Sequence, residues 1–220
     1  MHRFIAFSDV HRDYSTMFSI IESELPSEGI IIAGDLTTNG DVKEADGVMK
    51  QLAAYELPLI MVAGNMDPRP LEEIFRKYAN MVDGNGVVLG DTGFFGISGG
   101  PDSFMKTPYE RSEEEIMSAA LAGFEVVRTA EFKVLISHPP PYDTTLDRIF
   151  LGKHVGSRSV RKFVDQYQPD AVICGHIHES RGAESLGKSK MMNIGPTAGG
   201  NYAVVLAGDE IILELKNAKI

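Results

Sequence analysis

Short apolar segments rich in Ile, Val and Phe recur along the chain, and most of them end in a cluster of Gly, Asp, Asn or His. Several then give way to a stretch with helical periodicity, an alternation that predicts an α/β domain. Strands are expected at 3–8, 29–33, 58–63, 87–90, 94–98, 132–137, 171–174, 190–194, 202–206 and 211–215. Short turns separate the last three, which we interpret as a meander, so the sheet is not purely parallel.

Five amphipathic helices are expected between these strands, and each has a recognisable start. The first should bury an apolar face formed by Met17, Phe18, Ile21 and Leu25. The starts are marked by Asp13, by the capping-box pairs Asp41–Glu44 and Ser112–Glu115, by Pro70 at a first helical position, and by Ser157.

Two connections exceed the usual length of loops in such domains, namely 99–111 and 139–156. Long loops inside a compact domain are typically lids or walls of a substrate site. With no internal repeat and no linker between the predicted elements, residues 1–220 are expected to form a single domain.

The composition narrows the class of protein. Of the 220 residues, 43% are hydrophobic and 24% are charged, which is typical of a globular chain. Lys and Arg number 21 against 31 Asp and Glu, a formal net charge of −10 that disfavours binding to long nucleic acids or anionic membranes. Nothing approaches the roughly 18 apolar residues of a membrane span. The lone Cys174 excludes an internal disulfide and suits a cytoplasmic protein.

Polar residues stand where the apolar strands end, and the carboxyl ends of strands are where sites form in α/β folds. The residues in these positions are Asp9, His11, Asp35, Asn65, Asp67, His138, His176 and His178. Oxygen and imidazole donors without thiolate suit Mn, Fe, Zn, Co or Ni. Two divalent ions could share this set and would leave a residual positive charge that attracts a phosphate despite the acidic surface.

Five motifs occur in a fixed order: Asp9-Val10-His11, Gly34-Asp35, Gly64-Asn65, Ser137-His138-Pro139-Pro140 and Gly175-His176-Ile177-His178. In this order they resemble the calcineurin-like metallophosphoesterase superfamily, and the resemblance covers the chain from Arg3 to about Val205. The stretch from His138 to Gly182 is similar to the branch grouped with bacterial cyclic-nucleotide phosphodiesterases.

The resemblance implies an α/β (α+β) fold in four layers, a sandwich of two mixed β-sheets flanked by helices. It implies two divalent metal ions, manganese in the first place, with Fe, Zn, Ni or Co as alternatives. One metal would be held by Asp9, His11 and His178, the other by Asn65, His138 and His176, with Asp35 bridging both. A hydroxide that also bridges the ions would attack phosphorus.

Three glycines, Gly34, Gly64 and Gly175, precede these ligands, and we expect Gly64 and Gly175 to allow a close approach of the backbone to the site. For Gly34, an ordinary strand end remains an equal alternative.

The chain departs from the family pattern at one position. Most relatives have a histidine directly after the asparagine, credited with protonating the leaving group, whereas this chain has Met66. A thioether cannot donate a proton, although Asp67, which normally supports that histidine, is present. We expect poor alkyl leaving groups to suffer most, which favours phosphodiesters over phosphomonoesters. His154 could replace the acid, or it could be an exposed loop residue, and Lys153, Arg158 and Tyr142 are weaker candidates for substrate contacts.

The sequence therefore predicts a dinuclear-metal phosphoesterase acting on a small or nucleotide-like phosphate ester. A phosphoprotein or small-molecule phosphomonoesterase is the alternative within enzymes. A binding module that retained the fold without the chemistry is the alternative from another class. Self-association into a homo-oligomer is left open.

Overall fold

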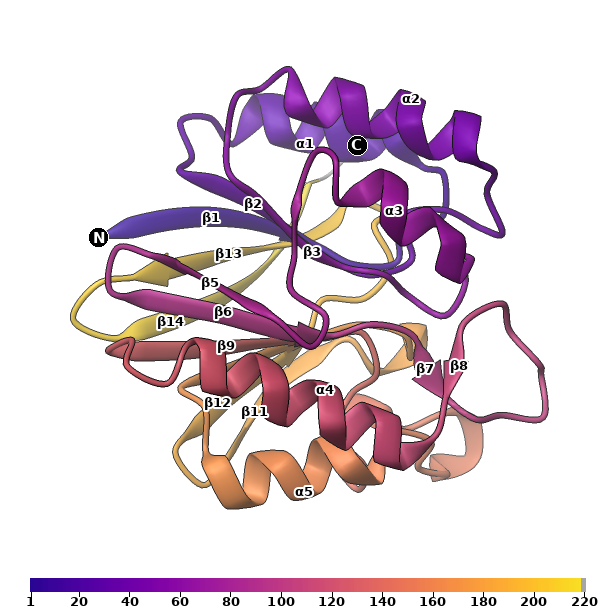
Figure 1. The fold of residues 1–220 in the computed structure, drawn as a ribbon, viewed down its shortest axis with the longest axis vertical. Coiled ribbons are helices and arrows are strands. Elements are labelled where there is room, and N and C mark those ends of the chain that lie inside the picture. Colours follow the sequence, from indigo (N-terminus) through magenta and orange to yellow (C-terminus); the bar gives the residue numbers. More distant parts are fainter. Residues whose placement is uncertain (219–220) are drawn as a thin grey trace.

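The computed structural model describes residues 1–218, which form two six-stranded β-sheets packed face to face between layers of helices (Figure 1). Helices α1 (Tyr14–Ser23), α2 (Val42–Ala53) and α3 (Glu72–Phe75) cover the outer side of the first sheet, and α4 (Glu113–Val126) and α5 (Arg158–Tyr167) that of the second. The four-layer α/β sandwich that the resemblance implied is confirmed.

The first sheet has the strand order β14 (Ile211–Asn217), β13 (Asn201–Ala207), β1 (His2–Phe7), β2 (Gly29–Ala33), β3 (Leu59–Val62) and β4 (Asn80–Met81). Strands β1 to β4 are parallel to one another, and β13 is antiparallel to both of its neighbours, β1 and β14. Because the parallel strands share one direction, the loops after β1, β2 and β3 meet at one edge.

The second sheet has the strand order β11 (Gly182–Leu186), β12 (Ser189–Asn193), β10 (Ala171–Cys174), β9 (Phe132–Ser137), β6 (Thr92–Ile97) and β5 (Gly86–Leu89). Its inner four strands are parallel, and β5 and β11 run antiparallel at its edges. The two-residue strands β7 (Gly100–Pro101) and β8 (Glu110–Arg111) pair with each other inside one of the long loops.

The expected meander at the end of the chain is wrong. Strand β12 belongs to the second sheet, whereas β13 and β14 form an antiparallel hairpin in the first. Residues 194–200 carry the chain from one sheet to the other: Ile194 N donates to Cys174 O at 2.9 Å, and Thr197 N donates to Asp9 O at 3.2 Å. The prediction paired these strands because they are close in sequence, but β12 lies in a different sheet from β13 and β14.

Four strands were not expected from the sequence: β4, β7, β8 and β11. Two residues are too few for a periodic signal, and β11 alternates only between half-buried and exposed positions. An edge strand of this kind shows no apolar run, because neither of its faces is fully covered.

Apolar side chains that point inward from both sheets form the central core. Phe4 of β1 and Phe94 of β6 meet edge to face with ring centroids 5.0 Å apart, and both side chains are fully buried. Separate clusters lie between each sheet and its helices. Strands buried on both faces explain the continuous apolar runs in the sequence.

Two of the expected helices differ in length. Helix α1 ends at Ser23, so Leu25 lies beyond it and is 43% exposed, while Ile20 occupies the buried face instead. Pro70 lies in a 3₁₀ turn, η1 (Arg69–Leu71), ahead of α3, which has only four residues. The N–H of Glu24 already closes the last turn of α1, and Pro26 has none to extend it.

The capping boxes have different outcomes. Ser112 and Glu115 exchange both hydrogen bonds at the start of α4. At α2, Asp41 accepts from Glu44 N at 2.8 Å, but the Glu44 carboxylate accepts from Arg12 and from Tyr14 Oη instead of completing the box. Three further 3₁₀ turns follow later in the chain: η2 (Thr145–Asp147), η3 (Phe150–Gly152) and η4 (His178–Ser180).

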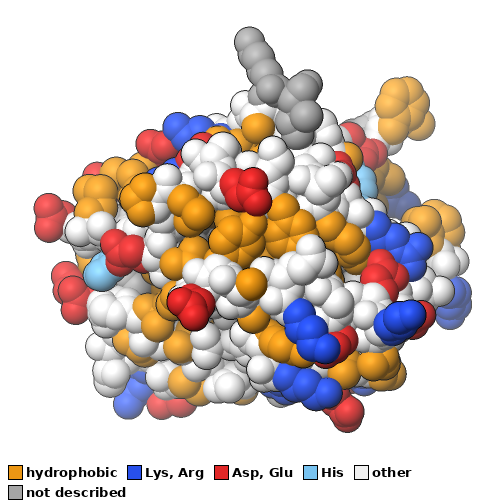
Figure 2. Space-filling view, turned by 90° about the horizontal axis from the view of Figure 1, so that it is seen from above, with side chains coloured by type: hydrophobic (Ala, Val, Ile, Leu, Met, Phe, Trp, Pro, Cys, Tyr) orange, Lys and Arg blue, Asp and Glu red, His pale blue; other side chains and the backbone are white. Residues whose placement is uncertain are grey.

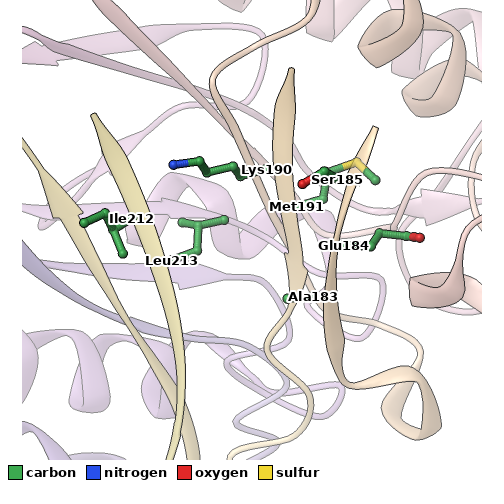
Figure 3. Close-up of a pocket in the computed structure, with 7 residues that line it drawn as sticks. All are labelled: Ala183, Glu184, Ser185, Lys190, Met191, Ile212 and Leu213. Carbon is green, nitrogen blue, oxygen red and sulfur yellow. The ribbon is translucent and has the colours of Figure 1, made fainter. Parts of the chain in front are cut away.

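The surface over α1 and α2 mixes both signs of charge around a band of hydrophobic side chains (Figure 2). Phe18 and Tyr55 stack there with ring centroids 6.2 Å apart and line a shallow hollow of about 310 Å³. A second hollow, of about 330 Å³, lies where the free edges of the two sheets meet, and residues of β11, β12 and β14 line it (Figure 3). Neither hollow is lined by a predicted metal ligand. None of the helices formed by residues 1–218 is long and apolar enough to cross a membrane.

One carboxylate ties the two helices of the second outer layer together. Glu113, in the first turn of α4, accepts from Ser157 Oγ at 2.7 Å, Arg158 N at 3.0 Å and Ser159 N at 2.8 Å, so it caps the N-terminus of α5. We predict that Glu113→Ala lowers the free energy of unfolding by about 1–2 kcal/mol in urea denaturation, the scale of a lost helix cap. The matched control is Glu114→Ala, an exposed neighbour in the same turn. Equal losses in the two variants would refute the capping role.

Candidate metal centre

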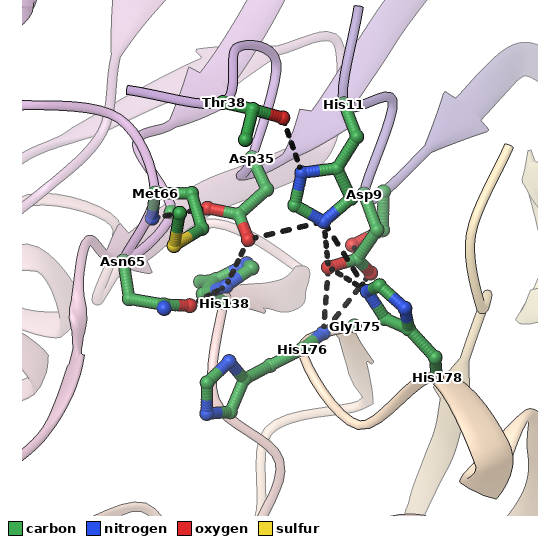
Figure 4. Close-up of polar contacts among 12 residues, drawn as sticks. Asp9, His11, Asp35, Thr38, Asn65, Met66, His138, Gly175, His176 and His178 are labelled. Atoms are coloured by element: carbon green, nitrogen blue, oxygen red, sulfur yellow. Dashed lines mark hydrogen bonds and ion pairs between the residues drawn. The ribbon is translucent and has the colours of Figure 1, made fainter. Parts of the chain in front are cut away.

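The predicted ligands come from loops at the carboxyl ends of five strands, three in the first sheet and two in the second (Figure 4). The loops after β1, β2 and β3 supply Asp9, His11, Asp35 and Asn65, and those after β9 and β10 supply His138, His176 and His178. The site therefore lies across the junction of the two sheets. Residues as far apart in the chain as His11 and His178, separated by 167 positions, become neighbours only because the sheets face each other.

Asp9, His11 and His178 form the first half of the site. Nε2 of His11 lies 3.3 Å from Nε2 of His178, and Oδ1 of Asp9 lies 3.3 Å from the same His178 atom. All three donor atoms lie within 4.8 Å of one another. Two imidazole nitrogens and a carboxylate oxygen that converge in this way match the predicted ligand set of one metal.

His138 and Asn65 lie in the second half, with Asp35 between the halves. Nε2 of His138 lies 2.9 Å from Oδ1 of Asn65 and 3.4 Å from Oδ2 of Asp35. The same Asp35 oxygen lies 3.5 Å from Nε2 of His11 in the first half. One carboxylate oxygen thus faces an imidazole on each side, the position that a bridging ligand requires.

His176 lies on the second side. Its ring centroid is 5.0 Å from that of His138, and its side chain points away from His178 (Figure 4). Its backbone N–H donates to both carboxylate oxygens of Asp9, at 3.1 and 3.0 Å. His176 therefore places its imidazole with the second half while its main chain holds a residue of the first.

Four of the seven candidate ligands have a left-handed backbone: φ is 50° at Asp9, 47° at His11, 53° at Asp35 and 69° at His176. Such conformations are uncommon for residues other than glycine, and they cluster at functional sites where surrounding contacts impose them. Here Asp9 N donates to Gly34 O at 3.0 Å and His11 N to Asp35 O at 2.9 Å, so the two loops hold each other in place.

The glycines before the ligands leave room for this convergence. A Cβ atom on Gly175 would lie 1.7 Å from Ser8 Oγ and 2.3 Å from Asp9 Oδ2, and one on Gly64 would lie 2.0 Å from Asp35 Oδ1. Gly34 has φ of +93°, and a Cβ there would lie 2.4 Å from Nδ1 of His138. All three positions exclude a side chain, so the site interpretation holds for Gly34 as well.

Hydrogen bonds on the outer side orient the ligands. Nδ1 of His138 donates to Ala33 O at 2.9 Å, Nδ1 of His11 lies 3.0 Å from Thr38 Oγ1, and Ser8 Oγ donates to Asp9 Oδ2 at 2.7 Å. Such contacts fix which imidazole nitrogen faces the centre. Sequence reasoning missed Ser8 and Thr38, because a hydroxyl residue beside a ligand has no distinctive pattern.

The buried charges shift one another's pKa. Burial alone would lower the pKa of His138, but the carboxylates of Asp35 and Asp9 raise it to about 9. Burial would raise the pKa of Asp9, yet the hydrogen bond with His178 and the charge on His138 hold it below its ordinary value. The pKa of His176 falls to about 4 because of burial and the neighbouring His138. The charged form is thus favoured at His138, beside the two carboxylates, whereas the neutral form is favoured at His176.

Asp67 is fully buried and serves as a clamp between loops. Its oxygens accept from Leu36 N at 3.2 Å, Thr37 N at 2.8 Å and Gly64 N at 2.9 Å. Burial and the charge of Asp35 raise the pKa of Asp67 to about 6. These contacts hold the loop after β2 against the loop after β3, which is a positioning role.

His154 stands apart from the ligands. Its Nδ1 lies 2.6 Å from Oδ1 of the buried Asp147, and its Nε2 lies 3.6 Å from Oδ1 of Asp143. Both ring nitrogens therefore face carboxylates of the loop to which His154 belongs. His154 is therefore not the exposed loop histidine that one interpretation of the sequence expected. These contacts also do not place it as a proton donor to a leaving group.

Met66 lies beside Asp35, and its backbone N–H donates to Asp35 Oδ1 at 2.7 Å (Figure 4). The main chain at this position thus supports the bridging carboxylate, while the side chain offers only a thioether. The donor set fits divalent cations, because carboxylates and imidazoles converge on shared points and the glycines leave room for those side chains.

Comparison with known proteins agrees with this geometry. Residues 2–180 match the model of the calcineurin-like phosphoesterase family. The chain belongs to this family and is a hydrolase of phosphoric ester bonds. The uncharacterized protein MJ1162 of Methanocaldococcus jannaschii is 31% identical over 171 residues, which cover 76% of this chain and 77% of that protein.

Solved structures share the fold at low identity. TT1561 of Thermus thermophilus has a TM-score of 0.74 at 17% identity, with 98% of each chain covered. A novel archaeal phosphodiesterase has a TM-score of 0.54 at 18% identity, with 97% of this chain and 99% of that chain covered. A putative 5′-nucleotidase from Staphylococcus aureus has a TM-score of 0.57 at 16% identity, and 98% of this chain covers 52% of it.

The steric role of Gly175 can be tested against a glycine with open surroundings. We predict that Gly175→Ala displaces Asp9 and weakens Mn²⁺ binding about tenfold or more in calorimetric titration, as loss of a ligand's support does elsewhere. A Cβ on Gly47, in the middle of α2, meets nothing within 4 Å. Gly47→Ala should therefore leave Mn²⁺ affinity unchanged and slightly raise the melting temperature. Native affinity in the Gly175 variant would contradict the proposed crowding.

Proposed function

We propose that the protein is a dinuclear-metal phosphodiesterase that hydrolyses a small or nucleotide-like phosphate ester. One observation favours a diester over a monoester: Met66 stands beside the candidate bridging carboxylate, at the position where the family pattern implies a histidine. The archaeal relative in fold is described as a phosphodiesterase. The proposal for this chain rests on Met66 and the ligand geometry rather than on the shared fold.

In this proposal Asp9, His11 and His178 hold one divalent cation, Asn65, His138 and His176 hold the other, and Asp35 contacts both. When bound, such a pair supplies Lewis-acid activation of the ester and makes water acidic enough to react near neutral pH. The chain's own contribution is to fix the donors: Ala33 O and Thr38 Oγ1 orient the imidazoles of His138 and His11.

The protein contributes little to protonating the leaving group. The Met66 side chain has no proton to donate, Asp67 is engaged by three backbone N–H groups, and His154 is engaged by Asp147. An ester whose leaving group departs as a stable anion needs no acid. Aryl esters and phosphoanhydrides meet this condition, whereas simple alkyl esters do not.

The preference for diesters can be measured directly. With Mn²⁺ added, kcat/KM for bis(p-nitrophenyl) phosphate should exceed that for p-nitrophenyl phosphate. Asp35→Asn should abolish turnover of both, because it removes a negative charge and a ligand shared by both halves. A clear preference for the monoester would instead support the phosphomonoesterase alternative.

Restoring a proton donor tests the role assigned to Met66. We predict that Met66→His raises kcat on a diester with an alkyl leaving group by roughly tenfold or more, a part of the 10²–10⁴ that general acid catalysis supplies. Turnover of the p-nitrophenyl diester should change little, since its leaving group needs no proton. Met66→Leu serves as the control for a change of shape alone. Equal effects of the two substitutions on the alkyl diester would contradict the assignment.

Metal stoichiometry separates the enzyme from a non-catalytic binding module. We predict close to two Mn²⁺ per chain by elemental analysis after equilibrium dialysis. His178→Ala and His138→Ala should each remove about one ion, because they belong to different halves. A chain that retains no stoichiometric metal would support the binding module.

A further inference from the structure

The long loop 139–156 carries two of the most exposed hydrophobic side chains of the described chain. Phe150 is 84% exposed and Leu151 is 91% exposed, side by side at the tip of a short hairpin. Leu151 has φ of 71°. A leucine in the left-handed region, where Gly or Asn would be unstrained, is a costly way to build a plain turn.

Backbone hydrogen bonds hold the hairpin together below its exposed tip. Arg148 and His154 form an antiparallel bridge, Ile149 N donates to Lys153 O at 3.0 Å, and Gly152 N donates to Ile149 O at 2.9 Å. At its base, His154 is held by the buried carboxylate of Asp147. The pairing of His154 with Asp147 therefore gives it a role in holding this hairpin.

The hairpin is also fastened to the metal centre. Phe150 N donates to Oε1 of Glu179 at 3.3 Å, and Ser180 Oγ donates to Arg148 O. Glu179 and Ser180 belong to η4, which begins with the candidate ligand His178. The apolar tip is thus placed at the rim of the site by direct contact with the turn that holds a ligand.

Positive charge gathers in the same segment. Residues 148–162 contain Arg148, Lys153, Arg158, Arg161 and Lys162 and no Asp or Glu, although the chain has a net charge of −10. Arg158 lies over the Tyr142 ring at 4.4 Å. Arg161 donates to the carbonyls of Tyr142 and Asp143 and is paired with Asp165 at 2.9 Å. Arg148 and Lys153, on the hairpin itself, are exposed. This is the local charge that an acidic protein needs to attract a phosphate ester.

We propose that the hairpin 148–154 is the substrate-binding wall of this centre. Phe150 and Leu151 contact an aromatic ring of the phosphate ester, either an aryl group or a nucleobase, and Arg148 and Lys153 attract its phosphate. The inference rests on the proposed function and deepens it. An aryl ester has a leaving group that needs no protonation, which suits a site with Met66 in place of a proton donor.

A second copy of the chain is the competing occupant of this surface, but a stable interface between copies needs a larger buried area. A stable interface buries about 800 Å² on each partner. An aromatic side chain buries about 150–250 Å², so a Phe–Leu tip flanked by two cations offers much less than that area. A single aromatic ring matches the size of the tip.

The other long loop, which contains β7 and β8, lies at the end of the molecule where the parallel strands end (Figure 1). Phe104 and Met105, between β7 and β8, are 92% and 70% exposed. At the base of this loop, a Cβ on Gly100 would lie 3.2 Å from Cβ of Asn65 and 3.6 Å from Cε1 of His176. Both long loops therefore have hydrophobic tips, and one is anchored beside Asn65 while the other is anchored to the turn that begins at His178.

Ligand binding to the Mn²⁺-loaded protein tests the proposal without turnover. Naphthylphosphonate and methylphosphonate share a head group and differ only in the ring. We predict that the wild-type protein binds naphthylphosphonate more tightly in calorimetry, and that the double variant Phe150→Ser, Leu151→Gly reduces this preference roughly tenfold. Affinity for methylphosphonate should not change, and the glycine removes backbone strain at position 151, so folding is not at risk.

Two further variants sharpen the result. Val126→Ser removes an exposed apolar side chain (51% exposed) at the far end of α4 and should leave both affinities unchanged. Arg148→Gln with Lys153→Gln should weaken both phosphonates alike and reduce the salt dependence of binding.

An unchanged ring preference in the double variant would overturn the proposal. If sedimentation showed instead that this variant dissociates an oligomer while the preference persists, the tip would be a self-association surface. The wild-type protein could fail to hydrolyse any diester and still prefer naphthylphosphonate, with the double variant losing that preference. This result would contradict the proposed phosphodiesterase activity but not the binding role of the hairpin.

Discussion

The burial of two carboxylates close to each other is the constraint on which the rest of the structure depends. Asp9 and Asp35 are 0% and 2% exposed, and a buried charge is tolerable only when it is paired or hydrogen-bonded. Nε2 of His138 and of His11 faces Asp35, and His178 faces Asp9. A divalent cation bound between an imidazole and a carboxylate would compensate the buried negative charge.

That constraint explains the unusual backbone around the centre. Loops from both sheets must approach within hydrogen-bonding distance, so four left-handed ligand residues and the close-packed Gly64 and Gly175 gather here. The two apolar-faced sheets provide the rigid frame that holds such strain. Asp67 joins adjacent loops of the first sheet, and Thr197 joins the crossing segment to Ser8 and Asp9.

The same end of the molecule combines a polar centre with a hydrophobic rim. Met66 lies inside the site, and the hairpin with Phe150 and Leu151 lies at its edge. The proposed chemistry without a protein acid and the proposed binding of an aromatic ring by the hairpin point toward the same class of ester. Although the chain has a net charge of −10, Arg148 and Lys153 on this hairpin are exposed cations.

Strong local signals were sufficient for much of the fold and for the ligand set. Strands β2, β9 and β10 have the predicted bounds, since strands buried on both faces are continuous apolar runs. Of the seven ligands that the family motifs implied, Asp9, His11, Asp35, His138 and His178 have donor atoms that converge. Only the tertiary structure decided which sheet each strand joins, that His154 pairs with Asp147, and that Ser8 and Thr38 orient the ligands. These features depend on contacts between residues far apart in the chain, and such contacts leave no periodic trace in the sequence.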